Sequence, residues 1–318
     1  MLFAYEDDLW KVDLDGQNGR QRLTADGILN WSVGEDFFMA SEYRRVFLSP
    51  DGCWAAFSHT GLDLVLLNVE NKSLTRIPGP GAAAVDWSPN SHSLTFVAEK
   101  QQPNGFDDLY VYDIESGELR QVLHLKNKND WGMIRKNSMI WSRDGRSIGF
   151  LCNFKDNHSG QFCRYDLASD TWQVTSPLQH MGIYTIWLCW TADRELTSNP
   201  KEGVHCVRSG EPGQYDWSFS QDGRYILELE RVLTNNAFSL TDPVRIRLYL
   251  SGNNKIVWQK ELDLPLRRAI WAPDGTSLFL DDDQDGTPIW KMPADGSSTP
   301  EVWLENGYLI GATACNRC

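Results

Sequence analysis

Short apolar runs separated by polar turns alternate along almost the whole chain, and the turns follow one pattern. The pattern reads S-P-D-G at 49–52, and variants of it stand at 88–91, 142–145, 220–223 and 272–275. Within it, Pro presets φ at the second position, Asp hydrogen bonds to its own backbone and Gly accepts the left-handed conformation. Two apolar runs joined by such a turn predict a β-hairpin. The recurrence therefore predicts a repeat architecture built from strands.

The spacing of the turns indicates how many repeats the chain contains. The interval from Ser142 to Ser220 is twice the interval from Ser49 to Ser88, which indicates a degenerate copy inside it. Residues 190–194 follow an apolar run and keep the aromatic residue, the small residue and the Asp. The units are then about 40–50 residues long, which is the length of a four-stranded β-propeller blade.

The two ends of the chain supply one more unit. Residues 1–5 read as the second strand of a blade that lacks its first strand, and 307–313 is the one candidate for that strand. We therefore expect an all-β fold, a seven-bladed β-propeller of four-stranded blades, closed by pairing of the N-terminal strands with a C-terminal strand. A fourth strand is not evident within 193–214. One domain should span 1–318, with blade cores at 43–77, 82–123, 137–175, 183–210, 215–260, 267–304, and 307–314 with 1–24.

These motifs resemble those of a known family. The turn, the (I/L)-x-F strand that follows it and the L-Y-x-x-D-x-x-x-G strand, as at 109–117, look like the WD40-like (PD40) repeats of TolB-type β-propellers. The resemblance covers nearly the whole chain and implies the fold. It implies little about chemistry, because each repeat residue serves turn geometry and blade packing.

Charge and hydropathy exclude two classes of partner. The formal net charge is −13 at pH 7, and no run of Lys and Arg exceeds two residues, so nucleic acid is a poor partner. No apolar run has the ~18 residues that a membrane span needs. The N-terminal residues lack the features of a signal peptide, so the chain as written is expected to be cytoplasmic. It would be periplasmic or secreted if a leader was removed, since TolB and many proteins similar to it are exported.

The cysteines are expected to be free thiols. The chain has seven, an odd number, and most are scattered through predicted strands, which is typical of buried thiols in a reducing compartment. Cys315 and Cys318 form an isolated CxxC at the chain end. A metal site would need a second pair, so this segment is interpreted as a frayed tail.

The long connections are expected on one face of the fold. The turns between first and second strands are tight, whereas long loops join second to third strands and fourth strands to the next blade, and both of these classes emerge around the mouth of the central channel. Aromatic and charged residues in these loops could bind a protein partner, because aromatic residues dominate binding hot spots. The alternative is that they pack over the blade beneath. The candidates are Trp31, Asp36, Phe37, Tyr43, Phe106 and Trp131.

Paired cations at the start of three predicted innermost strands suggest an anion site. Side chains alternate along a strand, so at most one cation of each pair points into the channel. Three such cations at one mouth would bind an anionic small molecule or glycan. The alternative is that neighbouring carboxylates neutralise them. The candidate residues are Arg44, Arg45, Arg135, Lys136, Arg267 and Arg268, with Tyr184, His158 and His180 nearby.

The acidic run at 281–286 permits two interpretations. It shares the D-x-D-x-D-G start of an EF-hand loop, but position twelve is Met292, so the bidentate carboxylate is absent. A plain hairpin turn is favoured, and a weak divalent-cation site at Asp281, Asp283 and Asp285 is the alternative. The Asp that precedes the third strand, as at Asp8 and Asp108, recurs with the repeat and is therefore predicted to be structural.

Catalytic motifs are missing from the sequence. There is no G-x-S-x-G elbow, and the six histidines contain no HxH, HxxxH or HExxH pattern. No cofactor and no catalytic residue is therefore predicted. The interpretation is a non-catalytic recognition propeller that binds a partner protein, or an anionic small molecule or glycan, on the face with the long loops. The alternative is a propeller enzyme, of lyase or hydrolase type, acting on an acidic sugar at the channel mouth.

Overall fold

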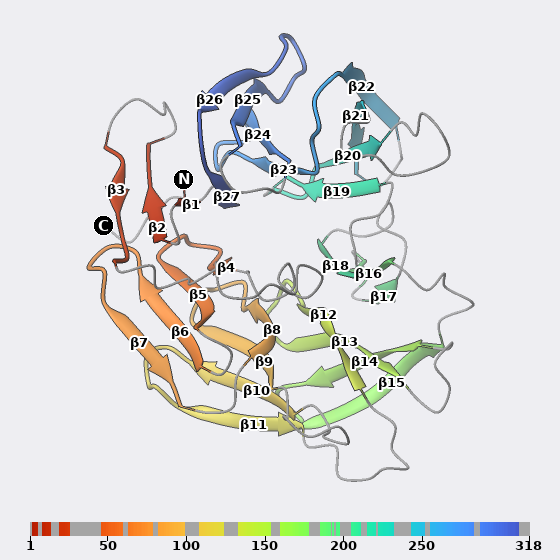
Figure 1. The fold of residues 1–318 in the computed structure, drawn as a ribbon. Coiled ribbons are helices and arrows are strands. Elements are labelled where there is room, and N and C mark those ends of the chain that lie inside the picture. Colours follow the sequence, from red (N-terminus) through yellow and green to blue (C-terminus); the bar gives the residue numbers. More distant parts are fainter. Residues whose placement is uncertain are drawn as a thin grey trace, which may run out of the picture. The chain divides into compact units, whose positions relative to one another are not determined.

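In the computed structural model, the described residues form strands and turns. They are arranged as seven antiparallel sheets, which we call A to G (Figure 1). The described residues are 2–5, 8–13, 19–25, 46–59, 63–78, 82–98, 108–123, 133–153, 160–177, 185–191, 193, 195–197, 205–210, 215–220, 222–231, 243–251, 255–282 and 287–311.

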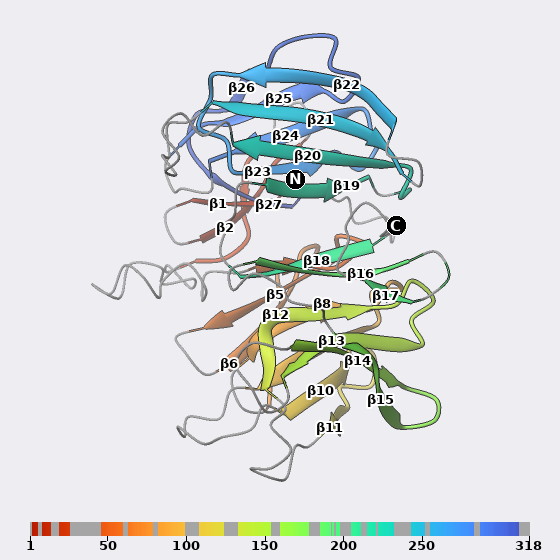
Figure 2. The same ribbon diagram turned by 90° about the vertical axis from the view of Figure 1, so that its right-hand side faces the viewer.

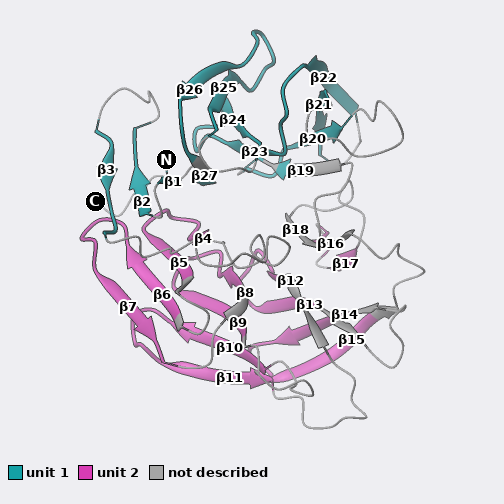
Figure 3. Ribbon diagram, viewed as in Figure 1, with its two compact units in different colours: residues 1–28, 212–314 teal, residues 29–211, 315–318 magenta. Residues whose placement is uncertain are grey.

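The chain divides into two compact units, which are coloured separately in Figure 3. Unit 1 comprises Met1–Ile28 and Pro212–Ala314, and unit 2 comprises Leu29–Glu211 and Cys315–Cys318. Each unit is described here by itself. Unit 1 contains sheets A, F and G, and unit 2 contains sheets B, C, D and E.

Unit 1 holds three four-stranded sheets, and in Figure 2 the strands of sheet F lie side by side in chain order. Sheet A is β27 (Tyr308–Gly311), β1 (Leu2–Tyr5), β2 (Asp8–Lys11) and β3 (Gln21–Arg22). Sheet F is β19 (Tyr215–Phe219), β20 (Tyr225–Arg231), β21 (Val244–Leu250) and β22 (Lys255–Leu262). Sheet G is β23 (Arg268–Trp271), β24 (Ser277–Asp281), β25 (Ile289–Pro293) and β26 (Glu301–Leu304).

Unit 2 holds the other four sheets. Sheet B is β4 (Val46–Leu48), β5 (Trp54–His59), β6 (Asp63–Asn68) and β7 (Leu74–Ile77). Sheet C is β8 (Ala82–Trp87), β9 (Ser93–Ala98), β10 (Asp108–Asp113) and β11 (Leu119–Leu123). Sheet D is β12 (Met133–Trp141), β13 (Ser147–Asn153), β14 (Gly160–Asp166) and β15 (Thr171–Pro177). Sheet E is β16 (Thr185–Trp190), β17 (Leu196–Thr197) and β18 (His205–Gly210).

The strands are apolar on both sides because neighbouring sheets of a unit pack face to face. In sheet C, Leu94 and Phe96 join the core shared with sheet B, whereas Val97 joins the core shared with sheet D. Sheets F and G share a core in the same way, as do sheets G and A. Burial of two faces explains why the strands read as near-continuous apolar runs rather than as a strict alternation.

The predicted turns form as the sequence indicates. In the first of them, the Gly52 N–H donates to the Ser49 carbonyl at 2.8 Å, and the Ser49 hydroxyl donates to Asp51 at 2.6 Å. Gly52 has φ of 70°, the left-handed conformation that costs glycine least. The Trp54 N–H donates to the Ser49 hydroxyl at 2.9 Å. The same pattern recurs in the turns that begin at Ser142 and Ser220, so the repeat is a hairpin turn closed by its own Ser and Asp.

The pairing of the two chain ends is confirmed. Strand β27 pairs antiparallel with β1, with Leu2 opposite Gly311 and Ala4 opposite Tyr308. The C-terminal segment therefore supplies the first strand of sheet A, as the missing strand at the N-terminus predicts.

Sheet E departs from the repeat. Only three of its strands lie within the described residues, and β16 is the middle one, pairing with β17 on one edge and with β18 on the other. In each of the other six sheets the strand that corresponds to β16 lies at an edge. Strand β17 is two residues long, at Leu196–Thr197, and does not link β16 to β18 as a second strand would. The weak repeat signal over 193–214 matches this irregularity.

The prediction of seven free thiols is wrong at three positions. Cys53, Cys163 and Cys189 are disulfide-bonded in the structure. Sequence spacing does not show which cysteines meet across strands, and this is why the prediction failed. Cys189, for example, stands directly opposite Cys206 in the register of β16 and β18.

Candidate functional site

The two ends of each four-stranded sheet differ in how the strands are connected. First-to-second and third-to-fourth turns leave from one end, which we call the turn end. Second-to-third connections and the exits of fourth strands leave from the other, which we call the loop end. Most turns at the turn end are short and hydrogen bonded, such as 49–54 and 68–73 in sheet B, although the connection 12–20 of sheet A is longer. Long connections such as 24–45 and 232–243 leave from the loop end, and most of their residues lie outside the described part of the chain.

At the loop end of sheet G, one of two adjacent arginines is neutralised within its own sheet. Arg268 stands opposite Asp281 in the register of β23 and β24, and its guanidinium donates to the Asp281 carboxylate at 2.8 Å. The Asp281 side chain is 1% exposed. A buried carboxylate without a cation would be costly, so Arg268 stabilises the sheet.

The neighbouring Arg267 is different. Its backbone N–H donates to the Asp281 carbonyl at 2.8 Å, which continues the pairing of β23 with β24 by one residue. Its half-buried side chain makes no ion pair with any residue that the structure describes. Arg268 is therefore neutralised within sheet G, whereas the role of Arg267 in binding a ligand stays a prediction.

The start of the acidic run, at the end of β24, is held by a hydrogen bond. Asp282 is 7% exposed and accepts a hydrogen bond from the Thr287 hydroxyl at 2.5 Å. Asp283 and Asp285 lie outside the described residues. Within the described residues, no group of three or more His, Cys, Asp or Glu could hold a metal ion. The divalent-cation site at Asp281, Asp283 and Asp285 therefore stays a prediction.

The recurring Asp before the third strand is structural in sheet A. Asp8 is 1% exposed and accepts hydrogen bonds from the Thr24 hydroxyl at 2.8 Å and from Arg22 Nε at 2.9 Å. The Leu9 N–H donates to the same Thr24 hydroxyl at 2.9 Å. Asp8 thereby ties β2 to β3 at the loop end, which confirms the predicted structural role.

The structure places few of the other predicted site residues. Arg135 and Lys136 lie in β12, where the register to β13 shifts between Ile134 and Met139. The other candidates lie outside the described residues, namely Trp31, Asp36, Phe37, Tyr43, Arg44, Arg45, Phe106, Trp131, His158, His180 and Tyr184.

One partly buried carboxyl was missed by the sequence analysis. Asp86 lies on β8 two residues before the turn serine, where four of the other repeats have Phe47, Ile140, Ser218 and Ile270. It accepts the backbone N–H of Trp141 in sheet D at 2.7 Å. Removal from water raises the pKa of Asp86 to about 7, although hydrogen bonds from backbone N–H groups lower it. The sequence signal for this site was a carboxyl at a repeat position where those four repeats have an uncharged residue.

A second missed feature is a charged ladder on one face of sheet F. Arg247 bridges Glu228 and Glu230 at 2.5 Å each, and Arg245 bonds Glu230 at 3.0 Å. The Tyr249 hydroxyl donates to Glu228 at 3.0 Å. Burial alone would lower the pKa of Arg247, but the hydrogen bond and the charges of the two glutamates raise it. The alternation Glu-x-Glu on β20 and Arg-x-Arg on β21 was the sequence signal.

Comparison with known proteins supports the fold. No protein-family model matches the chain, and no curated protein matches it. Among solved structures, an oligogalacturonate lyase in complex with manganese is similar at a TM-score of 0.55 and 12% identity, over 82% of this chain and 76% of that one. The β-propeller domain of the trilobed protease from Pyrococcus furiosus has a TM-score of 0.51 and 16% identity, over 82% and 84%. TolB from Acinetobacter baumannii has a TM-score of 0.47 and 13% identity, over 97% and 77%.

The chain therefore has a β-propeller fold of the TolB-like type, as the turn motifs predict. At these identities the likeness shows the fold alone. Among the described residues, none forms a helix that could cross a membrane.

Proposed function

We propose that the protein is a non-catalytic recognition propeller that binds an anionic group at the loop end. The seven sheets are its seven blades, and β27 completes the blade that β1 begins. The observation that carries the proposal is an asymmetry of most of the sheets: most turns at the turn end are short and hydrogen bonded, whereas most long connections leave from the loop end. Scaffolds place binding residues on such loops.

The charge of Arg267 at the loop end supports an anionic ligand. Arg267 has no carboxylate partner among the described residues, whereas Arg268 is neutralised by Asp281. An Arg guanidinium matches a carboxylate or phosphate in two-point geometry, and its fork loses little freedom on binding. The anionic group can belong to a partner protein, a small molecule or a glycan, and the test below separates these sources.

The alternative function is a lyase or hydrolase acting on an acidic sugar at the same end. The similarity to an oligogalacturonate lyase shows that this fold can carry such an activity, but it does not indicate the activity of this protein.

Disulfide-bonded cysteines favour an oxidising compartment, periplasmic or secreted, over the cytoplasm.

The test is titration calorimetry with inorganic phosphate, galacturonate and trigalacturonate. For an anion that binds, Arg267→Ala should weaken affinity at least fivefold. Arg224→Ala, which removes a turn-end arginine from the same unit, should leave it unchanged. Equal affinities in the parent and Arg267→Ala would contradict the assignment. If none of the three anions binds, acidic partner proteins remain as the source, and cleavage of trigalacturonate with or without manganese would instead establish the enzyme.

A further inference from the structure

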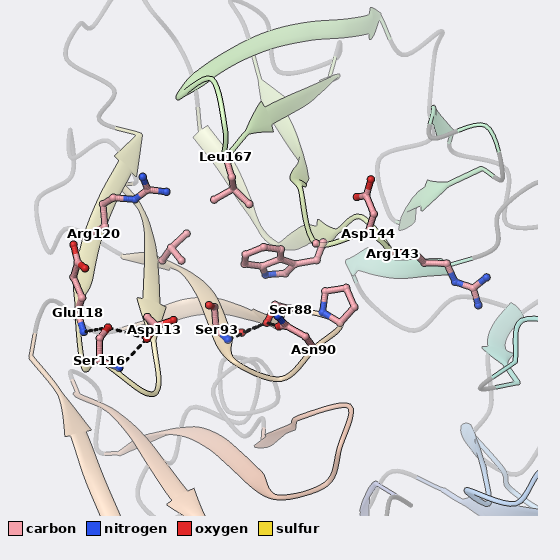
Figure 4. A pocket seen from close by; sticks show the side chains of 14 residues that line it. Ser88, Asn90, Ser93, Asp113, Ser116, Glu118, Arg120, Arg143, Asp144 and Leu167 are labelled. Atoms are coloured by element: carbon pink, nitrogen blue, oxygen red, sulfur yellow. Dashed lines mark hydrogen bonds between the residues drawn. The ribbon is translucent and has the colours of Figure 1, made fainter.

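A pocket of about 640 Å³ opens at the turn end of unit 2, between sheets C and D (Figure 4). The turn at Ser88–Asn90 and the turn at Arg143–Gly145 form two of its walls. Glu118, just before β11, and Arg120 of β11 stand along a third side, and Leu167, just after β14 of sheet D, points in (Figure 4). The pocket therefore lies at the end of sheets C and D where the short turns are.

One turn contact that joins sheets B and C is missing between sheets C and D. Between sheets B and C, the Ser91 hydroxyl accepts the backbone N–H of Asp51 at 3.0 Å and so joins the two turns. Ser91 takes the fourth place of its turn, at φ of 62°. The fourth place of the next turn is Gly145, at φ of 67°, which has no hydroxyl to reach the turn before it. The groove between sheets C and D therefore lacks this bridge.

Many polar groups of the pocket already serve the turns. The Ser88 hydroxyl donates to Asn90 at 2.7 Å and accepts from the Ser93 N–H at 2.9 Å. Asp113 accepts hydrogen bonds from the backbone N–H and from the hydroxyl of Ser116, both at 2.8 Å. These bonds hold the pocket wall in shape without a ligand.

Other polar groups are available. The side chains of Glu118, Arg120 and Arg143 make no hydrogen bond or ion pair with any residue in the described ranges. Hydrogen bonds from the Ser116 backbone and hydroxyl hold the pKa of Asp113 below its usual range, so that this carboxylate stays an acceptor at neutral pH. The pocket thus presents donors and acceptors side by side.

The charges of the lining argue against a simple ion as ligand. The lining contains two arginines, Arg120 and Arg143, and three carboxylates, those of Asp113, Glu118 and Asp144. An anion would meet three like charges and a cation two, and both would lose hydration on entry. Val111, Trp141 and Leu167 add an apolar part to the lining.

We propose that this pocket binds a neutral polyhydroxylated ligand, such as a mono- or disaccharide. Sugar hydroxyls donate and accept hydrogen bonds at short spacing, which suits Glu118 beside Arg120, and the C–H faces of a sugar suit the apolar part of the lining. The pocket is independent of the loop-end function.

The experiment uses the full chain and a panel of glucose, galactose, mannose, maltose and lactose, followed by saturation-transfer NMR and titration calorimetry. At least one sugar should bind the parent protein. Arg120→Ala and Glu118→Ala should each weaken that binding at least tenfold. Gly145→Ser should also weaken it, because the hydroxyl is placed to reach across to the preceding turn as that of Ser91 does.

The matched control is Gly275→Ser, which makes the same change at φ of 69° where a Cβ meets nothing within 4 Å. It should leave affinity unchanged, and circular dichroism confirms folding of every variant. The proposal is overturned if no sugar of the panel binds. It is equally overturned if Arg120→Ala binds as the parent does, or if phosphate competes with the sugar for Arg120, which would make the pocket an anion site.

Discussion

At the scale of single residues, one tryptophan indole differs from its counterparts. The indole N–H groups of Trp87, Trp190 and Trp271 each donate to a backbone carbonyl of the preceding sheet, at 2.9, 3.3 and 3.4 Å. The indole N–H of Trp141 is buried and has no partner among the described residues. Its backbone N–H instead reaches the Asp86 carboxyl of the preceding sheet. Where these other sheets are joined by a bond from an indole N–H to a backbone carbonyl, sheets C and D are joined by a bond to the Asp86 carboxyl, which can titrate.

This contact predicts a pH dependence of stability. The pKa of Asp86 is raised from 3.8 to about 7 in the folded protein, so the folded state holds this proton more tightly than the unfolded state. The contribution of Asp86 to the free energy of unfolding is complete below pH 3.8 and is lost as the pH rises to about 7. Asp86→Asn keeps an oxygen for Trp141 and cannot ionise. Urea midpoints should therefore fall less between pH 4.5 and 7 in Asp86→Asn than in the parent, with exposed Glu301→Gln as control; parallel slopes would refute this role.

The two arginines at the start of β23 should differ in their effect on stability. Arg268→Ala leaves the buried Asp281 carboxylate without this ion pair and should cost about 2 kcal/mol, below the usual cost of breaking a buried pair because Arg268 is partly exposed. Arg267→Ala should change stability by less than about 0.5 kcal/mol. Urea unfolding of both variants measures the difference, and equal losses would show that Arg267 is also structural.

The number of free cysteines can be measured by chemical labelling. Three disulfide-bonded cysteines need at least two disulfides, so no more than three of the seven cysteines are free. Alkylation in denaturant without reductant, followed by mass spectrometry, should label three at most. Labelling of all seven in protein purified under air would contradict the disulfides.

At the scale of elements, the turns and the strand order were predictable, whereas the contacts between strands were not. The Ser-x-Asp-Gly turns are local, so Ser49, Asp51 and Gly52 reveal their hydrogen bonds in the sequence itself. The ladder of sheet F depends on the register that sets Glu228 opposite Arg247 across a long loop. Arg268 was predicted to bind an anionic ligand because the sequence does not show that Asp281 stands opposite it in the register of β23 and β24.

The ladder of sheet F predicts a strongly non-additive pair of mutations. Arg247→Met leaves Glu228, whose side chain is 4% exposed, without its cation and should cost about 3 kcal/mol. Adding Glu228→Gln removes the uncompensated charge and should recover more than half of the loss. Urea unfolding of the two singles and the double completes the cycle. Additive losses would mean that the two charges do not stabilise each other.

At the scale of the whole molecule, the chain ends decide whether the proposed ring of blades closes. Strand β27 follows Gly307 and pairs with β1. Leu304, the last residue of β26, lies in the core shared by sheets A and G. Deleting 307–318 exposes an edge of sheet A and part of that core. The truncated chain should unfold at a lower temperature and less cooperatively by calorimetry; an unchanged transition would contradict closure by β27.

The measurement that tests the central claim most directly is hydrogen exchange by mass spectrometry, with and without an anion found to bind. Recognition at the loop end predicts slower exchange in peptides that cover loop-end segments such as 24–45, 124–132 and 232–243 and the residues around Arg267. Turn-end peptides such as 142–145 should exchange at the same rate in both samples. Protection confined to the turn-end peptides would contradict the account.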